Sequence, residues 1–244
     1  MPFNELTLLL YLAGSMAFCW FAVFMLTLNR PAPKIEIRNP KSQLIFVISS
    51  YAFLFAAYFA IHSYSTVINK NNKDLSDLLL AGITVAAVAA AALASGGGPE
   101  SAGLSFRRIE TAVFFLVPPA ALMFLPGHFM NWQALWRGIA LPLVAAGFAE
   151  ELFFRGFMQT RLESRLGNTR GLLITAAAYA VFKLPMLWGT LPAAGLIANM
   201  AGTFLIWGCA AGLIYRRSGN IYGLILLHIF WDAAPRVFLG FGIG

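Results

Sequence analysis

The sequence predicts an all-α membrane protein, a polytopic bundle of about eight transmembrane helices. Of its 244 residues, 59% are hydrophobic and only 11% are charged, whereas a soluble domain has about 25% charged residues. The apolar residues form runs of about 20, the length that crosses a bilayer as a helix. No charged stretch between these runs is long enough to form a soluble domain, so we expect a single membrane domain.

Four of the predicted spans lie in the first half of the chain, at 6–28, 44–63, 78–95 and 111–125. The first two are uninterrupted apolar runs on either side of a basic, proline-containing loop. The third is rich in alanine and ends at Gly96-Gly97-Gly98-Pro99, a sequence that stops a helix. The fourth is short and is interrupted by Pro118-Pro119.

The second half contains the other four, at 136–158, 171–188, 193–215 and 221–241. A charged loop that includes Arg161 and Arg165 separates the first two of these, and Pro192 marks the turn before the next. The spacing Gly208-x-x-x-Gly212 in the span at 193–215 predicts close packing against a neighbouring helix.

The basic residues predict the orientation of the bundle. With eight spans, alternate loops lie on the same side of the membrane, and positively charged loops stay in the cytoplasm. We therefore expect both termini outside the cytoplasm. The net charge of +7 is explained by these loops, so we expect no nucleic-acid partner. One set of loops holds Arg30, Lys34, Arg38, Lys41, Arg107, Arg108, Arg161, Arg165, Arg170, Arg216 and Arg217, and the other holds Lys70, Lys73 and Arg137.

Ionisable residues occur deep inside three of the predicted spans. Each such residue costs about 2.5–3.5 kcal/mol on insertion scales, so it is expected to face the interior of the bundle. At about 1.5 Å per helical residue, Glu150, Lys183 and His228 lie roughly 10–18 Å from the cytoplasmic ends of their spans. We expect the ionisable residues of the three spans to meet in one cavity. They are Glu150, Glu151 and Arg155 in the span at 136–158, Lys183 in that at 171–188, and His228 and Asp232 in that at 221–241.

Helical geometry suggests how these groups divide the work. Glu151 and Arg155 are four residues apart, a good separation for an ion pair. Glu150 is turned by about 100° from Glu151, so it is expected to point toward His228 and to act as a general base. His228 polarises a water or a carbonyl or binds a metal, and Asp232, on the same helix face, orients His228 or a substrate group. A proton relay or small transporter also uses buried acids and bases, but the sequence has no inverted repeat with paired broken helices.

Residues 138–235 resemble the CPBP family of intramembrane proteases, also called the CAAX-protease and bacteriocin-processing or Abi family, which includes the prenyl-protein endopeptidase Ras-converting enzyme. The family pattern is Glu-Glu-x-x-x-Arg, then Phe-x-x-x-His, then His-x-x-x-Asn or Asp. Glu150, Glu151 and Arg155 match the first element, and His228 and Asp232 match the third. The resemblance implies an eight-helix membrane endopeptidase in which Glu150 activates water.

The second element departs from the family pattern, because Tyr179 stands at its aromatic position and Lys183 at its histidine position. A protonated lysine offers a metal no lone pair, so the resemblance leaves open whether Glu150 and His228 hold a zinc ion. Lys183 either positions Glu150 in a glutamate-type protease, or stabilises the oxyanion of the tetrahedral intermediate, or neutralises Glu150 in a catalytically impaired pseudoprotease, immunity factor or scaffold. Arg155 and Tyr179 are then orienting residues, and Glu150, Glu151, Lys183, His228 and Asp232 the catalytic set.

The resemblance divides the chain unequally. Residues 1–110 are generic transmembrane helices, whereas residues 111–244 are expected to form the catalytic core. The partners implied are membrane lipid and a membrane-associated peptide or protein substrate. The short loops favour the inner membrane of a bacterium.

Overall fold

The computed structural model describes residues 5–28, 40–67, 73–94, 98–106, 108–118, 142–188 and 191–239. Within these ranges the chain is helical and contains no strand, which confirms the predicted all-α class. In chain order the elements are α1 (Glu5–Thr27), α2 (Pro40–Val67), α3 (Lys73–Ala94), η2 (Pro99–Ala102), η3 (Ile109–Leu116), α6 (Pro142–Glu151), η4 (Leu152–Gln159), α7 (Thr160–Leu166), α8 (Asn168–Leu187), α9 (Ala193–Gly202), η5 (Thr203–Ala210), α10 (Ala211–Ser218) and α11 (Tyr222–Leu239).

Most predicted spans coincide with a described helix to within a few residues. This holds for the spans at 6–28, 44–63, 78–95, 171–188, 193–215 and 221–241. Long apolar runs form helices because a helix satisfies its own backbone hydrogen bonds. Of the other two predicted spans, residues 119–125 and 136–141 lie outside the described residues, as do the basic residues Arg30, Lys34, Arg38, Lys70, Arg107 and Arg137.

The predicted end of the span at 136–158 is wrong. The elements α6, η4 and α7 follow one another directly, so the helix continues to Leu166 and includes the stretch expected to be a charged loop. Arg161 is only 2% exposed, and its guanidinium donates to Gln43 Oε1 at 2.8 Å and to the carbonyl of Ser101 at 2.9 Å. These acceptors, from α2 and η2, allow a charged residue to be buried where the sequence alone predicted a loop. The turn to α8 is made at Gly167, whose positive φ of 84° favours glycine.

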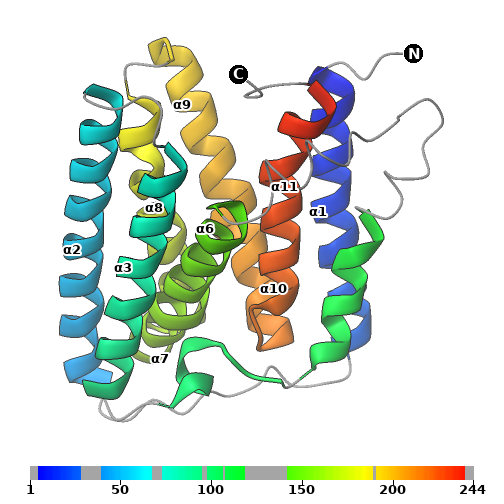
Figure 1. The fold of residues 1–244 in the computed structure, drawn as a ribbon. Coiled ribbons are helices and arrows are strands. Elements are labelled where there is room, and N and C mark those ends of the chain that lie inside the picture. Colours follow the sequence, from blue (N-terminus) through cyan, green and yellow to red (C-terminus); the bar gives the residue numbers. More distant parts are fainter. Residues whose placement is uncertain are drawn as a thin grey trace.

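The helix that carries Glu150 lies inside the bundle. In Figure 1, α6 and α7 run between α2 and α3 on one side and α10 and α11 on the other, and α6 packs against both α3 and α11. Gly147 permits the close approach to α11, since a Cβ there would lie 3.3 Å from Ile229 and 3.7 Å from His228. On the far side, the ring of Phe154 in η4 contacts those of Tyr179 and Phe182 in α8, with centroids 4.8 and 5.2 Å apart.

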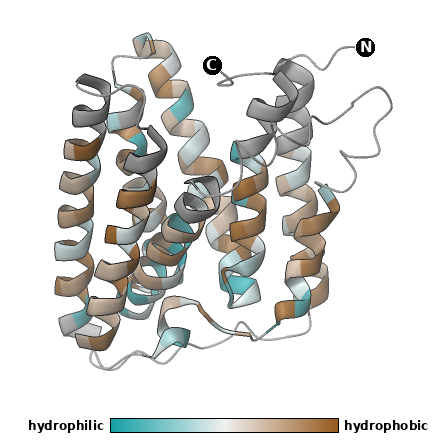
Figure 2. Cartoon of the chain, in the orientation of Figure 1, coloured by the Kyte–Doolittle hydropathy of each residue, from teal (hydrophilic) through white to brown (hydrophobic). Residues whose placement is uncertain are grey.

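The outer faces of the described helices are apolar. Figure 2 shows hydrophobic residues along most of the length of α2, α3 and η3. Large side chains such as Phe21, Ile45, Phe53 and Leu93 are more than half exposed. Among the residues that the structure describes, two helical segments are long and apolar enough to cross a membrane, Gln43–Ile61 and Ala193–Ser218.

Candidate functional site

Three separate parts of the bundle bring the predicted site residues together. Glu150 and Glu151 end α6, and Arg155 follows one turn later in η4. Tyr179 and Lys183 lie one turn apart on α8, and His228 and Asp232 lie one turn apart on α11. Hydrogen bonds and ion pairs of 2.5–3.6 Å join these seven side chains into one network. Most of them contact Glu150 or His228, and Arg155 joins the network through Glu151.

Both carboxylate oxygens of Glu150 are held from α8. Lys183 Nζ lies 2.5 Å from Oε1, and the hydroxyl of Tyr179 donates to Oε2 at 2.8 Å. Two donors on different oxygens fix the plane of the carboxylate. Glu150 and Lys183 are 14% and 16% exposed, so the pair lies at the edge of the interior with limited access.

Glu151 lies deeper and is fully buried. Its Oε1 lies 3.3 Å from Arg155 Nη1, as the i, i+4 spacing predicted. The same oxygen lies 2.8 Å from His228 Nδ1. From the sequence, Asp232 was expected to orient His228 or a substrate group. In the structure, the close carboxylate contact at Nδ1 of His228 comes from Glu151.

The other ring nitrogen of His228 faces the more open part of the site. Its Nε2 lies 3.6 Å from Glu150 Oε2 and 3.6 Å from Asp232 Oδ2. These separations are too long for direct hydrogen bonds. Asp232 is 38% exposed and is the most accessible charged group of the set. The Nε2 side of His228 is therefore the side nearer to the surroundings of the protein.

A tryptophan outside the sequence motifs, Trp207, packs against the site. The indole of Trp207, in η5, stacks on the imidazole of His228 with centroids 4.6 Å apart and an angle of 28° between the planes. Its backbone carbonyl accepts a hydrogen bond from the guanidinium of Arg155. The available sequence signal was the neighbouring Gly208: a Cβ there would overlap Ala176 of α8, so η5 packs closely on that helix.

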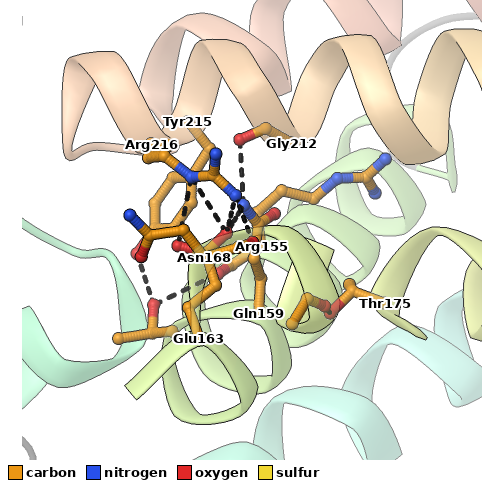
Figure 3. A network of polar contacts seen from close by, with 10 residues as sticks. Arg155, Gln159, Glu163, Asn168, Thr175, Gly212, Tyr215 and Arg216 are labelled. Atoms are coloured by element: carbon orange, nitrogen blue, oxygen red, sulfur yellow. Dashed lines mark hydrogen bonds and ion pairs between the residues drawn. The ribbon is translucent and has the colours of Figure 1, made fainter. Parts of the chain in front are cut away.

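A second polar network, next to the site, ties α7 to α10 (Figure 3). Gln159 donates to Glu163 Oε1 at 2.8 Å and to the carbonyl of Gly212 at 2.9 Å. The guanidinium of Arg216 binds the same carboxylate, with Nη2 2.8 Å from Oε1. Gln159 lies one turn after Arg155, so this network holds the helix that carries the site just beyond the site residues.

The donor set does not fit a zinc ion of the usual kind. Zinc sites in proteins use sulfur, imidazole or carboxylate ligands with open lone pairs. Here the Lys183 ammonium, which has no lone pair to offer, occupies one oxygen of Glu150, and Tyr179 donates to the other. Among the residues that the structure describes, no group of three or more His, Cys, Asp or Glu is arranged to hold a metal ion.

The arrangement brings a carboxylate, an imidazole and an ammonium together beside the partly exposed Asp232. A carboxylate and an imidazole accept protons from water, and an ammonium stabilises developing negative charge. Such a set suits hydrolysis of a carbonyl compound.

Comparison with known proteins agrees with this chemistry. No curated protein and no solved structure matches the chain. A family model does match: residues 131–234 fit that of the Rce1-like type II CAAX prenyl endopeptidases. The matched segment contains every site residue discussed above. The match confirms the resemblance seen in the motifs: residues 131–234 are similar to the Rce1-like type II CAAX prenyl endopeptidases.

Proposed function

We propose that this protein is a membrane-embedded endopeptidase that cleaves a membrane-associated peptide or protein. The observation that carries the proposal is the meeting of Glu150, Lys183 and His228, from three helices, with separations of 2.5 Å and 3.6 Å around Glu150. An ion pair alone would need only the first two. An imidazole nitrogen near the carboxylate, with the partly exposed Asp232 beside it, is what a hydrolytic site adds.

Membrane embedding follows from the outer surface. Contiguous apolar side chains exposed on α1, α2 and α3 would be unfavourable in water but are matched by lipid. We propose eight spans with both termini outside the cytoplasm, in the inner membrane of a bacterium. The even number agrees with Figure 1, in which α1 begins and α11 ends at the same end of the bundle.

The chemical step uses Glu150 as the proton carrier. A water beside Glu150 Oε2 and His228 Nε2 attacks the carbonyl carbon of the substrate, and its proton passes to Glu150. One N–H of Lys183 binds Glu150 at 2.5 Å, which leaves its other two donors for the oxyanion of the tetrahedral intermediate. When the C–N bond breaks, Glu150 returns the proton to the leaving amine. The products are a carboxylic acid and an amine, and Glu150 is a carboxylate again.

The test compares purified full-length protein with Glu150→Ala and Glu150→Gln in nanodiscs. The substrates are quenched fluorescent peptides of two kinds, farnesylated peptides ending in a CAAX sequence and unprenylated hydrophobic leader peptides. We expect the wild type to cleave at least one kind and both variants to lose at least about a hundredfold in rate. Glu110→Gln, a change to an exposed acid of η3, is the control and should retain activity. Equal cleavage by wild type and Glu150→Ala would overturn the proposal.

A second candidate function is that of a catalytically impaired family member, a binding or scaffold protein. The observation in its favour is the short Lys183–Glu150 contact, which neutralises the proposed base. Lys183→His distinguishes the two, because it restores the residue type of the family pattern. If this variant gains peptidase activity with added zinc while the wild type has none, the natural chain is the impaired form. If the wild type is active and Lys183→His is not, lysine is part of the working site.

A further inference from the structure

Trp207 contacts His228 directly and is linked to Glu151 through Arg155. Its indole stacks on the His228 imidazole at 4.6 Å, and its backbone carbonyl accepts a hydrogen bond from Arg155. Arg155 in turn lies 3.3 Å from Glu151 Oε1. Trp207 therefore constrains the imidazole directly through its side chain, and the Glu151 carboxylate only indirectly, through Arg155.

The stack restricts the one motion that the hydrogen bond leaves free. The 2.8 Å contact between Glu151 Oε1 and Nδ1 holds one edge of the His228 ring, but the ring is able to tilt about that contact. A nearly parallel indole, 28° from the imidazole plane, opposes the tilt. With Nδ1 on Glu151 and the plane fixed, Nε2 is directed between Glu150 and Asp232, 3.6 Å from each.

The indole is itself held in place. Trp207 is only 7% exposed, and its ring makes an edge contact with that of Trp231, with centroids 5.5 Å apart and an angle of 82°. Trp231 and His228 lie three residues apart on α11, so Trp207 is seated on two side chains of one helix face. Its own segment, η5, and the segment of Arg155, η4, are both π-helical. Such segments are rare and are frequent at functional sites.

We propose that Trp207 is a positioning residue: by fixing the plane of the His228 ring it keeps the Nδ1 proton directed at Glu151, and thereby the tautomer, with the lone pair of Nε2 facing Glu150 and Asp232. The orientation of the imidazole stands independently of the proposed function. Its consequence for peptide cleavage rests on that function.

The first experiment reads the imidazole directly. Full-length protein labelled with ¹⁵N-histidine is reconstituted in detergent micelles, and the ring nitrogens of His228 are identified by their loss in His228→Gln. We expect wild type and Trp207→Phe to show a single tautomer with the proton on Nδ1. In Trp207→Leu the Nδ1 and Nε2 resonances should move toward each other as the tautomers mix. Unchanged ring resonances in Trp207→Leu would overturn the proposal.

The second experiment measures cleavage with the peptides described above. Trp207→Leu should lower kcat by about 10- to 100-fold, because a small misplacement of a catalytic group has an effect of that size. KM should stay within about threefold, and Trp207→Phe should keep kcat within about threefold, since a phenyl ring retains the stack. Trp188→Leu makes the same change at a residue that is 71% exposed and should leave both constants unchanged.

The two readouts separate the possible failures. If the tautomer changes as expected but the wild type cleaves no peptide, the positioning role stands and the proposed function fails. If the wild type cleaves and Trp207→Leu retains its kcat, the catalytic part of the proposal is wrong. If Trp207→Leu does not purify as a folded protein, Trp207→Met provides the same loss of the aromatic ring with a larger side chain. Rescue by Trp207→Phe but not by Trp207→Met identifies the stack as the required feature.

Discussion

The Glu150–Lys183 ion pair offers a quantitative test of how the site is held. The two side chains are 14% and 16% exposed, and their charged atoms are 2.5 Å apart. Removing one partner of a buried pair leaves the other charge uncompensated, which lowers the free energy of unfolding by about 3–5 kcal/mol. Because both groups retain some access to water, we expect the lower end of that range for Lys183→Met and for Glu150→Gln, about 3 kcal/mol each.

The double variant should be much less destabilised than the two single changes suggest. With both charges removed, no buried ion remains, and replacing a pair by neutral groups is often nearly neutral. We expect a loss of about 1–2 kcal/mol, and hence a coupling energy of about 4–5 kcal/mol. At an effective dielectric constant of about 20, unit charges 2.5 Å apart attract each other by about 6–7 kcal/mol, which sets an upper limit on this coupling energy.

The measurement is reversible unfolding of the full chain in mixed micelles, titrated with a denaturing detergent and followed by far-ultraviolet circular dichroism. Arg170→Gln, at an exposed residue of α8, serves as the control for the loss of a surface charge and should change the unfolding free energy by less than about 0.5 kcal/mol. If the effects of Lys183→Met and Glu150→Gln add within about 0.5 kcal/mol, the two groups do not form the pair described here.

Three further changes test the packing around the site. Glu163→Gln weakens the contact with Arg216, 2.8 Å away, and should lower the unfolding free energy by about 1 kcal/mol; an unchanged value in the same titration would argue against the network in Figure 3. Gly156→Ala places a Cβ against a carbonyl of η2 and should lower the unfolding free energy by about 2 kcal/mol. Gly82 has open space around it, so Gly82→Ala should raise the unfolding free energy by about 0.5–1 kcal/mol. Effects of equal sign would contradict the close approach of η4 to η2 at Gly156. Tyr179→Phe removes a 2.8 Å hydrogen bond to the proposed base and should lower the cleavage rate by about tenfold, the equivalent of about 1.4 kcal/mol; a rate equal to that of the wild type would show that this bond does not orient the carboxylate during catalysis.

The positions of the helices were largely predictable because they depend on local properties. The length of an apolar run is enough to place the helix that begins near Glu5 or the one that ends near Leu187. The end of the helix that carries the site was not predictable, because it depends on contacts between distant elements. The sequence around Arg161 is that of a loop, and only the acceptors at Gln43 and Ser101 make its burial in α7 favourable.

The same division applies to the site. The contacts within one helix were predictable, since Glu151 and Arg155 share a face by their spacing, and the structure gives them an ion pair of 3.3 Å. The rotation of α6 and α11 about their axes decides which carboxylate faces each nitrogen of His228. The spacing of residues along one helix does not predict this rotation. In the structure both acids reach the ring, Glu151 at Nδ1 and Glu150 on the side of Nε2.

The lysine at the family's histidine position changes what the site needs from its surroundings. A neutral histidine would leave the Glu150 carboxylate without a counter-charge unless a metal ion supplied one. Lys183 supplies that charge itself, as Arg155 does for Glu151. Each of the two adjacent glutamates thus has its own cation, and each also has a contact with one side of the same imidazole. In such a site the cations Lys183 and Arg155 hold the two carboxylates in place. Because Glu150 and Lys183 depend on each other, they must be changed both separately and together to learn whether the pair serves catalysis or only stability.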